Sequence, residues 1–240
     1  MSSAYNYHIS IILPCYNPTT DFAGIVKDSF LKIKNSVNKD IELIIVDDGS
    51  FKNFNEEAIR GFFAELSEVK IISYAANKGK GYALREGTKA ANGELIIYTD
   101  IDFPYTHQSF LKIYSALAND KVDVAMGVRN REYYEHIPKT RVRISKLLRF
   151  FIKKFLRIPS DDTQCGLKGF NQTGKEVFLQ TTINRYLFDL EFIFLAARKK
   201  AVIKTVEVEL RSGIQLSSMR WKILLQESGN FLKIFAQSIF

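Results

Sequence analysis

The first half of the chain alternates short runs of aliphatic and β-branched residues with longer amphipathic segments. Five runs are apolar on both faces, as buried strands of a parallel sheet are; they lie at 9–13, 42–46, 69–73, 95–98 and 122–126. The segments between them, at about 21–37, 55–67, 80–91 and 107–118, have the period of helices that pack on a core. This order predicts an α/β fold with a Rossmann-like, mostly parallel sheet flanked by helices.

The second half is less regular. Its pattern predicts a basic amphipathic helix, a loop at 159–169, helices near 172–180 and 186–200, a strand near 202–210 and a terminal amphipathic helix from about 216. We find no internal repeat and no linker rich in Pro, Gly or Ser. Because 240 residues suit one compact domain, we expect a single domain over 1–240.

The excess positive charge of the chain lies in one segment. The net charge is +8, and residues 139–157 hold eight Lys or Arg and no Asp or Glu, which leaves 26 basic and 26 acidic residues elsewhere. Phe and Leu alternate with these basic residues at helical spacing. The helix either packs its apolar face on the core or lies at a membrane interface, and in both cases it attracts anions. Nucleic acid fits less well, because single-strand readers present aromatic residues on a sheet or groove.

Several classes of protein are excluded or disfavoured. No apolar run approaches the roughly 18 residues of a membrane span, and the N-terminus lacks the basic region of a signal peptide. Cys15 and Cys165 cannot form a disulfide scaffold, although one bridge stays formally open, and so few cysteines favour a cytosolic setting. The three histidines have neither metal spacing nor a Cys partner, so zinc and Ser/His or Cys/His catalysis lack support.

Polar turns follow the predicted strands, where open parallel sheets bind their ligands. The first strand ends in Pro-Cys-Tyr-Asn-Pro at 14–18, and neither G-x-G-x-x-G nor G-x-x-x-x-G-K-[ST] occurs, which argues against a dinucleotide site and a P-loop hydrolase. The second strand ends in Asp47-Asp48-Gly49-Ser50. These carboxylates suit ribose hydroxyls or base N–H groups, or they cap the turn.

The third and fourth strands are followed by a Gly-Lys loop and by two spaced carboxylates. The loop at 77–85 opens a helix and presents backbone N–H groups and positive charge to a phosphate or diphosphate. Asp100 and Asp102 leave the fourth strand, and Pro104 indicates a turn that lets both face one crevice. A divalent cation such as Mg²⁺ or Mn²⁺ on a diphosphate suits this arrangement. One bound nucleotide would touch the turns after the second, third and fourth strands.

In this order and spacing, the motifs resemble those of the family 2 glycosyltransferases of GT-A fold, and within them the polyprenyl-phosphate (dolichyl-phosphate) glucose and mannose synthases. The resemblance covers about residues 8–210. Its motifs are SIILPCYNP at 10–18, ELIIVDDGS at 42–50, NKGKGYALREG at 77–87, ANGELIIYTDID at 91–102, MGVR at 126–129, RVRIS at 141–145, DTQCGLKGF at 162–170 and FDLEF at 188–192. DTQCG followed by F-D-x-E is most similar to the glucosyltransferase branch, which favours glucose over mannose and a UDP donor.

The resemblance implies a role for each matching residue. It implies a nucleotide-sugar half at about 1–130 and an acceptor half at about 131–240. Donor-binding residues would be Pro14, Tyr16, Asn17, Asp48, Lys78, Gly79, Lys80, Gly81 and Asp100. Asp102, with Asp100, would hold the metal. Arg129 and Arg141 or Arg143 would hold phosphates, Asp162 and Gln164 would shape the acceptor side, and Asp189 or Glu191 would face the sugar. Mannose synthases often have a metal-binding Gln where this chain has Pro104, so a third metal ligand is left open.

We therefore expect a hexosyltransferase that moves a sugar from a UDP- or GDP-hexose to polyprenyl phosphate by metal-assisted inverting transfer, peripherally at the cytosolic face of the membrane. A lipid phosphate is already ionised and needs cations rather than a general base, and residues 139–157 supply cations.

Three alternatives stay open. The first is a saccharide acceptor of a surface polymer, with Asp189 or Glu191 as base. The second is a non-catalytic protein that binds nucleotide sugars or anionic membranes. The third, a nucleotidyltransferase, fits less well because its Gly-rich loop should follow the first strand. A homo-oligomer is also open, since the terminal helix has an apolar face for the core, a second copy or a membrane surface.

Overall fold

The computed structural model describes residues 5–129, 162–212, 229–230 and 234. The basic segment 139–157, with Arg141 and Arg143, falls outside these residues. Of the terminal helix expected from about 216, only residues 229–230 and 234 are described, and all three are helical.

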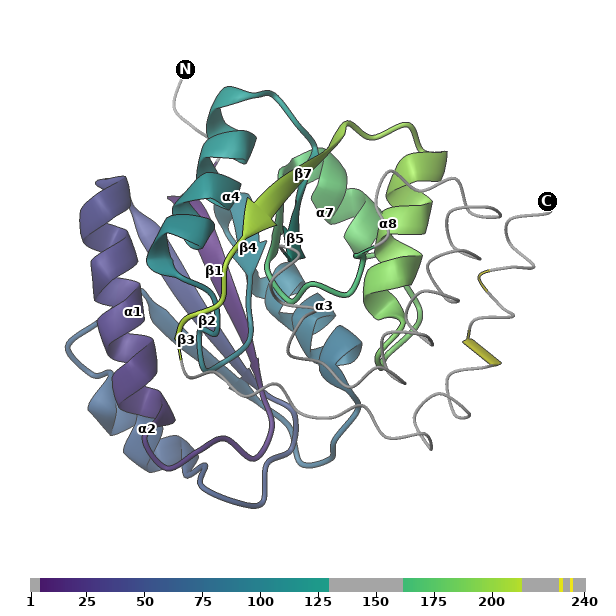
Figure 1. Ribbon diagram of the computed structural model, residues 1–240. Coiled ribbons are helices and arrows are strands. Elements are labelled where there is room, and N and C mark those ends of the chain that lie inside the picture. The colour runs from purple at the N-terminus through teal and green to yellow at the C-terminus, as the bar shows by residue number, and fades with distance from the viewer. Residues whose placement is uncertain (1–4, 130–161, 213–228, 231–233, 235–240) are drawn as a thin grey trace.

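One sheet carries the fold (Figure 1). Its strands are β1 (Tyr7–Cys15), β2 (Ile41–Asp47), β3 (Val69–Ser73), β4 (Gly93–Tyr98), β5 (Val124–Arg129), β6 (Lys168–Phe170) and β7 (Ile203–Val208). They lie in the order β3-β2-β1-β4-β6-β5-β7. Among the described strands, β6 alone runs antiparallel to its neighbours. The predicted α/β fold with a mostly parallel sheet is therefore confirmed.

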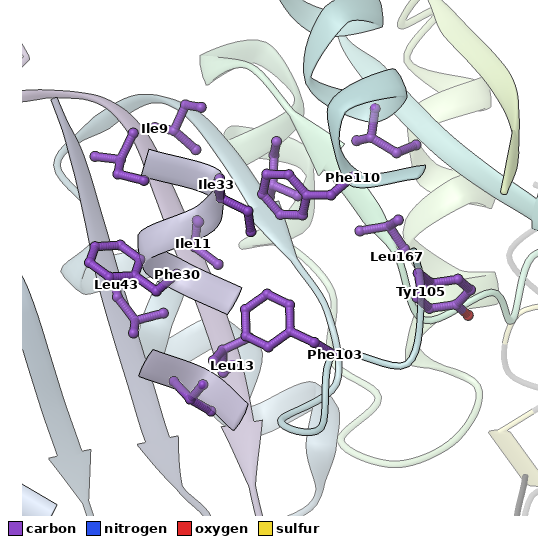
Figure 2. Close-up of a cluster of buried hydrophobic side chains, with 14 of the residues drawn as sticks. Ile9, Ile11, Leu13, Phe30, Ile33, Leu43, Phe103, Tyr105, Phe110 and Leu167 are labelled. Atoms are coloured by element: carbon purple, nitrogen blue, oxygen red, sulfur yellow. The ribbon is translucent and has the colours of Figure 1, made fainter. Parts of the chain in front are cut away.

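Six helices are described, and they cover both faces of the sheet (Figure 1). They are α1 (Phe22–Val37), α2 (Glu56–Phe62), α3 (Lys80–Ala90), α4 (His107–Asn119), α7 (Gln172–Phe178) and α8 (Phe188–Arg198). Because side chains alternate along a strand, Ile9, Ile11 and Leu13 of β1 pack with α1 and α4 (Figure 2). Ile12 faces the opposite way, into the core formed with α3, α7 and α8.

The strand β6 corrects the prediction of a loop over 159–169. Its three residues, Lys-Gly-Phe, are too few to show a period in the sequence. They form a strand because they fill the gap between β4 and β5, with Gly169 opposite both Ile97 and Ala125. A Cβ at Gly169 would lie 2.6 Å from a methyl carbon of Leu117, so a larger residue would not fit under α4.

The register of the parallel strands brings their carboxyl ends to one edge of the sheet. Cys15 of β1 pairs with Asp47 of β2, and Asp47 pairs with Ser73 of β3. Ile12 of β1 pairs with Tyr98, the last residue of β4. Because β6 is antiparallel, it begins at this same edge, so the loop at 162–167 joins the turns after β1, β2 and β4.

Among the described residues, no helix is both long and apolar enough to cross a bilayer.

Phe170 of β6 tests how much of the stability depends on this short strand. Its ring is fully buried, stacks on Phe178 with centroids 5.3 Å apart and meets Phe192 edge-on at 5.5 Å. Phe170→Ala should lower the free energy of unfolding by about 3–5 kcal/mol, since it leaves a cavity between sheet and helices. Urea unfolding monitored by circular dichroism measures this loss. The control is Phe62→Ala at a ring that is 44% exposed, which should change stability by about 0.5 kcal/mol. Equal losses in both variants would contradict a core role for β6.

Candidate functional site

The turn after β2 is held by its own carboxylates. Asp47 accepts a hydrogen bond from the backbone N–H of Ser50 at 3.1 Å, which confirms the alternative that this residue caps the turn. Burial raises the pKa of Asp47, and the neighbouring Asp48 adds to the rise. The turn itself depends on Gly49, which has a φ of +72° and lies against the backbone of Ala76.

Asp48 fixes the segment that leads into the Gly-Lys loop. Its buried carboxylate accepts hydrogen bonds from the Tyr74 hydroxyl at 2.7 Å, the Asn77 amide at 2.8 Å, and the N–H groups of Lys78 at 2.8 Å and Gly79 at 2.9 Å. Each oxygen therefore receives two bonds from the protein. The expected contact between Asp48 and a nucleobase stays a prediction, whereas its hold on residues 74–79 is observed.

The Gly-Lys loop differs from its predicted form in how its backbone is used. The N–H groups of Lys78 and Gly79 bind Asp48, and that of Gly81 donates to the Asn184 carbonyl at 2.8 Å. These three N–H groups are thus not presented to a phosphate, because the protein itself binds them. The loop offers the Lys80 ammonium instead.

Arg85 and Glu191 build the platform under this loop. Arg85 is buried and donates to the carbonyl of Ile183 at 2.9 Å and to the side chain of Asn184. From the other side, Glu191 accepts from the N–H groups of Thr182 and Ile183, both at 2.8 Å. Glu191 was expected to face the sugar. Its carboxylate is instead buried in protein contacts that hold residues 182–183, and its catalytic role stays a prediction.

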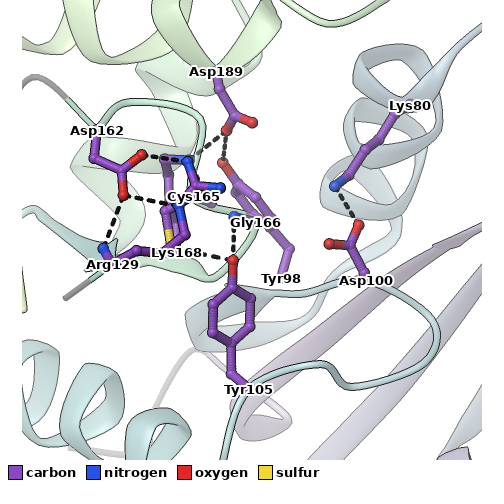
Figure 3. Close-up of polar contacts among 10 residues, drawn as sticks. All are labelled: Lys80, Tyr98, Asp100, Tyr105, Arg129, Asp162, Cys165, Gly166, Lys168 and Asp189. Carbon is purple, nitrogen blue, oxygen red and sulfur yellow. Dashed lines mark hydrogen bonds and ion pairs between the residues drawn. The ribbon is translucent and has the colours of Figure 1, made fainter. Parts of the chain in front are cut away.

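The two lysines of the loop go different ways. The Lys78 ammonium lies over the rings of Tyr82 and Tyr74, 4.5 and 5.2 Å from their centroids. Lys80, the first residue of α3, reaches Asp100 and forms an ion pair with its carboxylate (Figure 3). The structure therefore unites Lys80, but not Lys78, with the carboxylates after β4.

The segment after β4 turns as predicted. Phe103 adopts a φ of +45° and donates its N–H to the Asp100 carbonyl at 3.0 Å, while its ring packs into the core (Figure 2). Asp102 is partly buried, and its pKa is raised, first by that burial and then by the charge of Asp100. The two carboxylates therefore repel each other across the turn.

Arg211 is a residue of this site that the sequence did not reveal. It follows β7, and its guanidinium donates to the backbone carbonyl of Asp102, while its N–H donates to the Pro104 carbonyl at 2.8 Å. Its Nε is buried and has no hydrogen-bond partner among the described residues. A buried donor in this state is uncommon, because most buried polar groups in proteins are hydrogen-bonded.

The carboxylates after β4 fit a hard divalent cation. Oxygen ligands suit Mg²⁺ and Mn²⁺, and a cation would relieve the repulsion that raises the pKa of Asp102. Within the described part of the chain, no cluster of three or more His, Cys, Asp or Glu has the geometry of a metal site. Asp100 and Asp102 would therefore supply only part of the coordination, and a diphosphate and water would supply the rest.

Arg129 and Asp162 bind each other at the end of β5 (Figure 3). The N–H and Nε of Arg129 donate to one carboxylate oxygen at 2.8 and 3.0 Å, and its terminal nitrogen pairs with the other. Burial alone would raise the pKa of Asp162, but the hydrogen bonds and charge of Arg129 outweigh it, so this pKa is lowered. Gln164 lies half-buried in the same loop. The phosphate-binding role of Arg129 stays a prediction.

A buried ion pair connects this loop to α8. Lys168 is fully buried and donates to Asp189 at 2.7 Å and to the Cys165 carbonyl at 2.5 Å. Tyr98 donates its hydroxyl to the same oxygen of Asp189 at 2.6 Å (Figure 3). Asp189, expected to face the sugar, is thus only 4% exposed and engaged by two donors. Its catalytic role also stays a prediction.

The cysteines support this packing as thiols. Both are buried and unbridged, so the formally open disulfide does not form. Burial raises the pKa of Cys15 to about 12. The Cys165 thiol donates to the Tyr105 hydroxyl at 3.3 Å, and the Gly166 N–H donates to the same oxygen at 2.9 Å.

Two exposed aromatic rings lie beside the turns after β1 and β2. Tyr16 is 47% and Phe51 70% exposed, and they meet edge-on with centroids 6.1 Å apart. Asn17, at a φ of +47°, accepts from the N–H groups of Phe51 at 2.9 Å and Lys52 at 3.1 Å, which ties the two turns together. Pro14 lies half-buried within β1. Of the donor-binding residues predicted at 14–17, Tyr16 is exposed, whereas Pro14 and Asn17 are half-buried.

Comparison with known proteins gives one family and one fold. The family described as "Glycosyl transferase family 2" matches residues 10–178. Dolichyl-phosphate beta-glucosyltransferases are similar to the chain: the one from Dictyostelium discoideum is 24% identical over 85% of this chain, and the human one is 26% identical over 83%. The chain spans 66% of the length of each of these two relatives.

Solved structures share the architecture. Glucosyl-3-phosphoglycerate synthase from Mycobacterium tuberculosis, in complex with Mn²⁺, UDP and glucosyl-3-phosphoglycerate, aligns with a TM-score of 0.67 at 17% identity, over 97% of this chain and 80% of that one. A mannosyltransferase from Pyrobaculum calidifontis, in complex with GDP-Man and Mn²⁺, aligns with a TM-score of 0.59 at 15% identity, over 98% and 65%. At these identities the likeness establishes the fold.

The buried pair of Lys168 and Asp189 gives a test of the site's framework. Lys168→Met should lower the free energy of unfolding by about 3–5 kcal/mol, because it leaves the Asp189 carboxylate buried without its cation. Adding Asp189→Asn should recover much of this loss, since it removes the unpaired charge and keeps an acceptor for Tyr98. Denaturant unfolding of the two variants measures both effects.

The matched control for this pair is Lys204→Met. Lys204 pairs with Asp120 at 2.7 Å on the surface, where both side chains are over 40% exposed, so its loss should cost at most about 1 kcal/mol. If Lys168→Met were no more costly than Lys204→Met, the buried pair would not hold the site together.

Proposed function

This chain belongs to glycosyl transferase family 2, and from that premise we propose that it transfers a glucosyl group from a nucleotide sugar to a polyprenyl phosphate. The names of the relatives, dolichyl-phosphate beta-glucosyltransferases, support this acceptor and sugar. The clustering of Lys80, Asp100, Asp102 and Arg211 at the carboxyl edge of the sheet supports binding of a metal diphosphate there.

The donor would lie across the turns after β1, β2 and β4. Tyr16, which follows β1, offers an exposed aromatic face to the base. The diphosphate would lie over Asp100 and Asp102, near the charges of Lys80 and Arg211. These cations would stabilise the negative charge that gathers on the leaving nucleoside diphosphate. Mg²⁺ or Mn²⁺ held by the two carboxylates would, when bound, neutralise part of the same charge.

One observation favours a phosphate over a hydroxyl as acceptor. The two carboxylates expected to serve as a general base, those of Asp189 and Glu191, are 4% and 1% exposed and accept hydrogen bonds from protein groups. A saccharide hydroxyl needs such a base, whereas an ionised lipid phosphate does not. The eight basic residues of 139–157 supply positive charge that suits a lipid phosphate and an anionic membrane surface.

Substitution of these two carboxylates would not identify a base. Asp189 holds Lys168, and Glu191 holds residues 182–183, so either change should lower activity through the fold. The acceptor must therefore be identified by the product that forms.

The decisive assay supplies radiolabelled UDP-glucose or GDP-mannose, a short polyprenyl phosphate and Mg²⁺ or Mn²⁺, and follows label into the organic phase. We expect lipid-linked label from UDP-glucose. Asp102→Asn should lower its formation by about 10²–10³-fold, the loss typical when a charge-stabilising group is removed. Asp120→Asn, at the surface pair with Lys204, should leave the rate unchanged.

Each other outcome contradicts the proposal in a different way. Metal-dependent hydrolysis of the donor without lipid label would indicate that the acceptor is a saccharide rather than a lipid phosphate. Binding of donor without any turnover would indicate a non-catalytic binding protein.

A further inference from the structure

We propose that Lys80 is a resident counter-cation of Asp100, and that it makes the site bind a divalent metal together with a nucleoside diphosphate and only weakly without one. This inference rests on the proposed function, since it assumes that Asp100 and Asp102 hold the metal. It concerns whether the metal ion can bind tightly before the nucleoside diphosphate is present.

The position of Lys80 is fixed by the protein behind it. It follows Gly79, whose φ of +104° and contact with the Asn184 carbonyl, 2.4 Å from where a Cβ would lie, exclude a larger residue. Two residues before Lys80, the N–H of Lys78 donates to the Asp48 carboxylate at 2.8 Å. One residue after it, the N–H of Gly81 donates to the Asn184 carbonyl at 2.8 Å. The start of α3 is thus anchored on both sides, and the Lys80 side chain leaves it toward Asp100 (Figure 3).

The Asp100 carboxylate lies between two elements. One oxygen forms the ion pair with Lys80. The other packs against Gly166, where a Cβ would lie 2.5 Å from it, and Gly166 is in turn held by the Tyr105 hydroxyl. A metal ion that binds the first oxygen of Asp100 must therefore share or replace the Lys80 contact, while the second oxygen lies beside Gly166.

The charges around the turn balance in the absence of a ligand. Asp100 and Asp102 carry two negative charges, and Lys80 and Arg211 carry two positive charges in contact with the same segment. A bare dication would find no net attraction there. A diphosphate adds the missing negative charge and gives the Lys80 ammonium an anion to bind. The lysine, a flexible point charge with three donors, can then turn from Asp100 to a phosphate oxygen.

A purely structural ion pair would behave differently. Lys80 and Asp100 are 34% and 39% exposed at their side chains, a degree at which a pair contributes little to folding. If the pair only supported the fold, removing the lysine would leave the affinity for metal unchanged. The affinity for Mn²⁺ in the absence of nucleotide therefore separates the two roles.

The test measures free Mn²⁺ by electron paramagnetic resonance while the full chain is titrated in, with and without UDP. We expect weak Mn²⁺ binding by the wild type alone and at least about 10-fold tighter binding with UDP, the size of a typical coupling between ligands. Lys80→Met should tighten Mn²⁺ binding without UDP by about 10-fold and reduce the effect of UDP, since 1.4 kcal/mol of relieved repulsion is a factor of ten.

Two further variants keep the result interpretable. Lys80→Arg retains the charge and should bind Mn²⁺ alone as weakly as the wild type. Lys89→Met removes one charge from the same helix at a residue that is paired with Glu86 on the surface, and it should change nothing. Unfolding in urea checks that each variant is folded.

The outcomes distinguish this inference from the proposed function. Tight, UDP-dependent Mn²⁺ binding that Lys80→Met leaves unaltered would overturn the role of Lys80 and leave the proposed function intact. If Lys89→Met tightened Mn²⁺ binding as well, the change would be an effect of net charge alone, and the specific role of Lys80 would also be overturned. Failure of the wild type to bind Mn²⁺ even with UDP would overturn both.

Discussion

The hydrogen-bonded ladders that β1 forms with β2 and β4 set the geometry on which the site depends. Because all three strands are parallel and in the register described above, their carboxyl ends deliver Tyr16, Asp48 and Asp100 to one edge. The antiparallel β6 then brings the loop at 162–167 to the same edge from the opposite direction. A shift of one residue in β1 would move its side chains to the wrong faces and separate these turns. The chemistry of the site is therefore a consequence of strand pairing before it is a property of any one residue.

Around this edge, the protein satisfies most of its own charges. Asp48 is bound by residues 74–79, Arg129 by Asp162, and Asp189 by Lys168 and Tyr98. These contacts hold the backbone of the surrounding loops in place. A framework fixed in this way can stabilise charge on a ligand without having to reorganise. The groups around Asp100 and Asp102 differ, since two carboxylates and two cations lie close together there.

The sequence predicts what depends on local pattern. Period and motif placed the other six described strands, the turn after Asp102 and the Lys80 loop, because each is set by neighbours along the chain. Strand β6 could not be predicted, because three residues are too few to show a hydrophobic period, and the strand forms only where β4 and β5 leave room for it. The role of Arg211 could not be predicted, because its contact with Asp102 joins residues that are 109 positions apart in the sequence. For the same reason the sequence could not show that Glu191 binds 182–183, or that the loop N–H groups expected at a phosphate are already used by Asp48 and Asn184.

The proposed function requires that the carboxyl edge of this sheet bind the diphosphate of a nucleotide sugar through a metal. Calorimetric titration of UDP-glucose into the full chain, with Mg²⁺ and again with excess EDTA, tests this requirement. We expect saturable binding with Mg²⁺ that is lost on chelation and is lost in Asp102→Asn. Binding that is equally strong with EDTA would contradict the metal's role, and absence of binding under both conditions would contradict the proposed function itself.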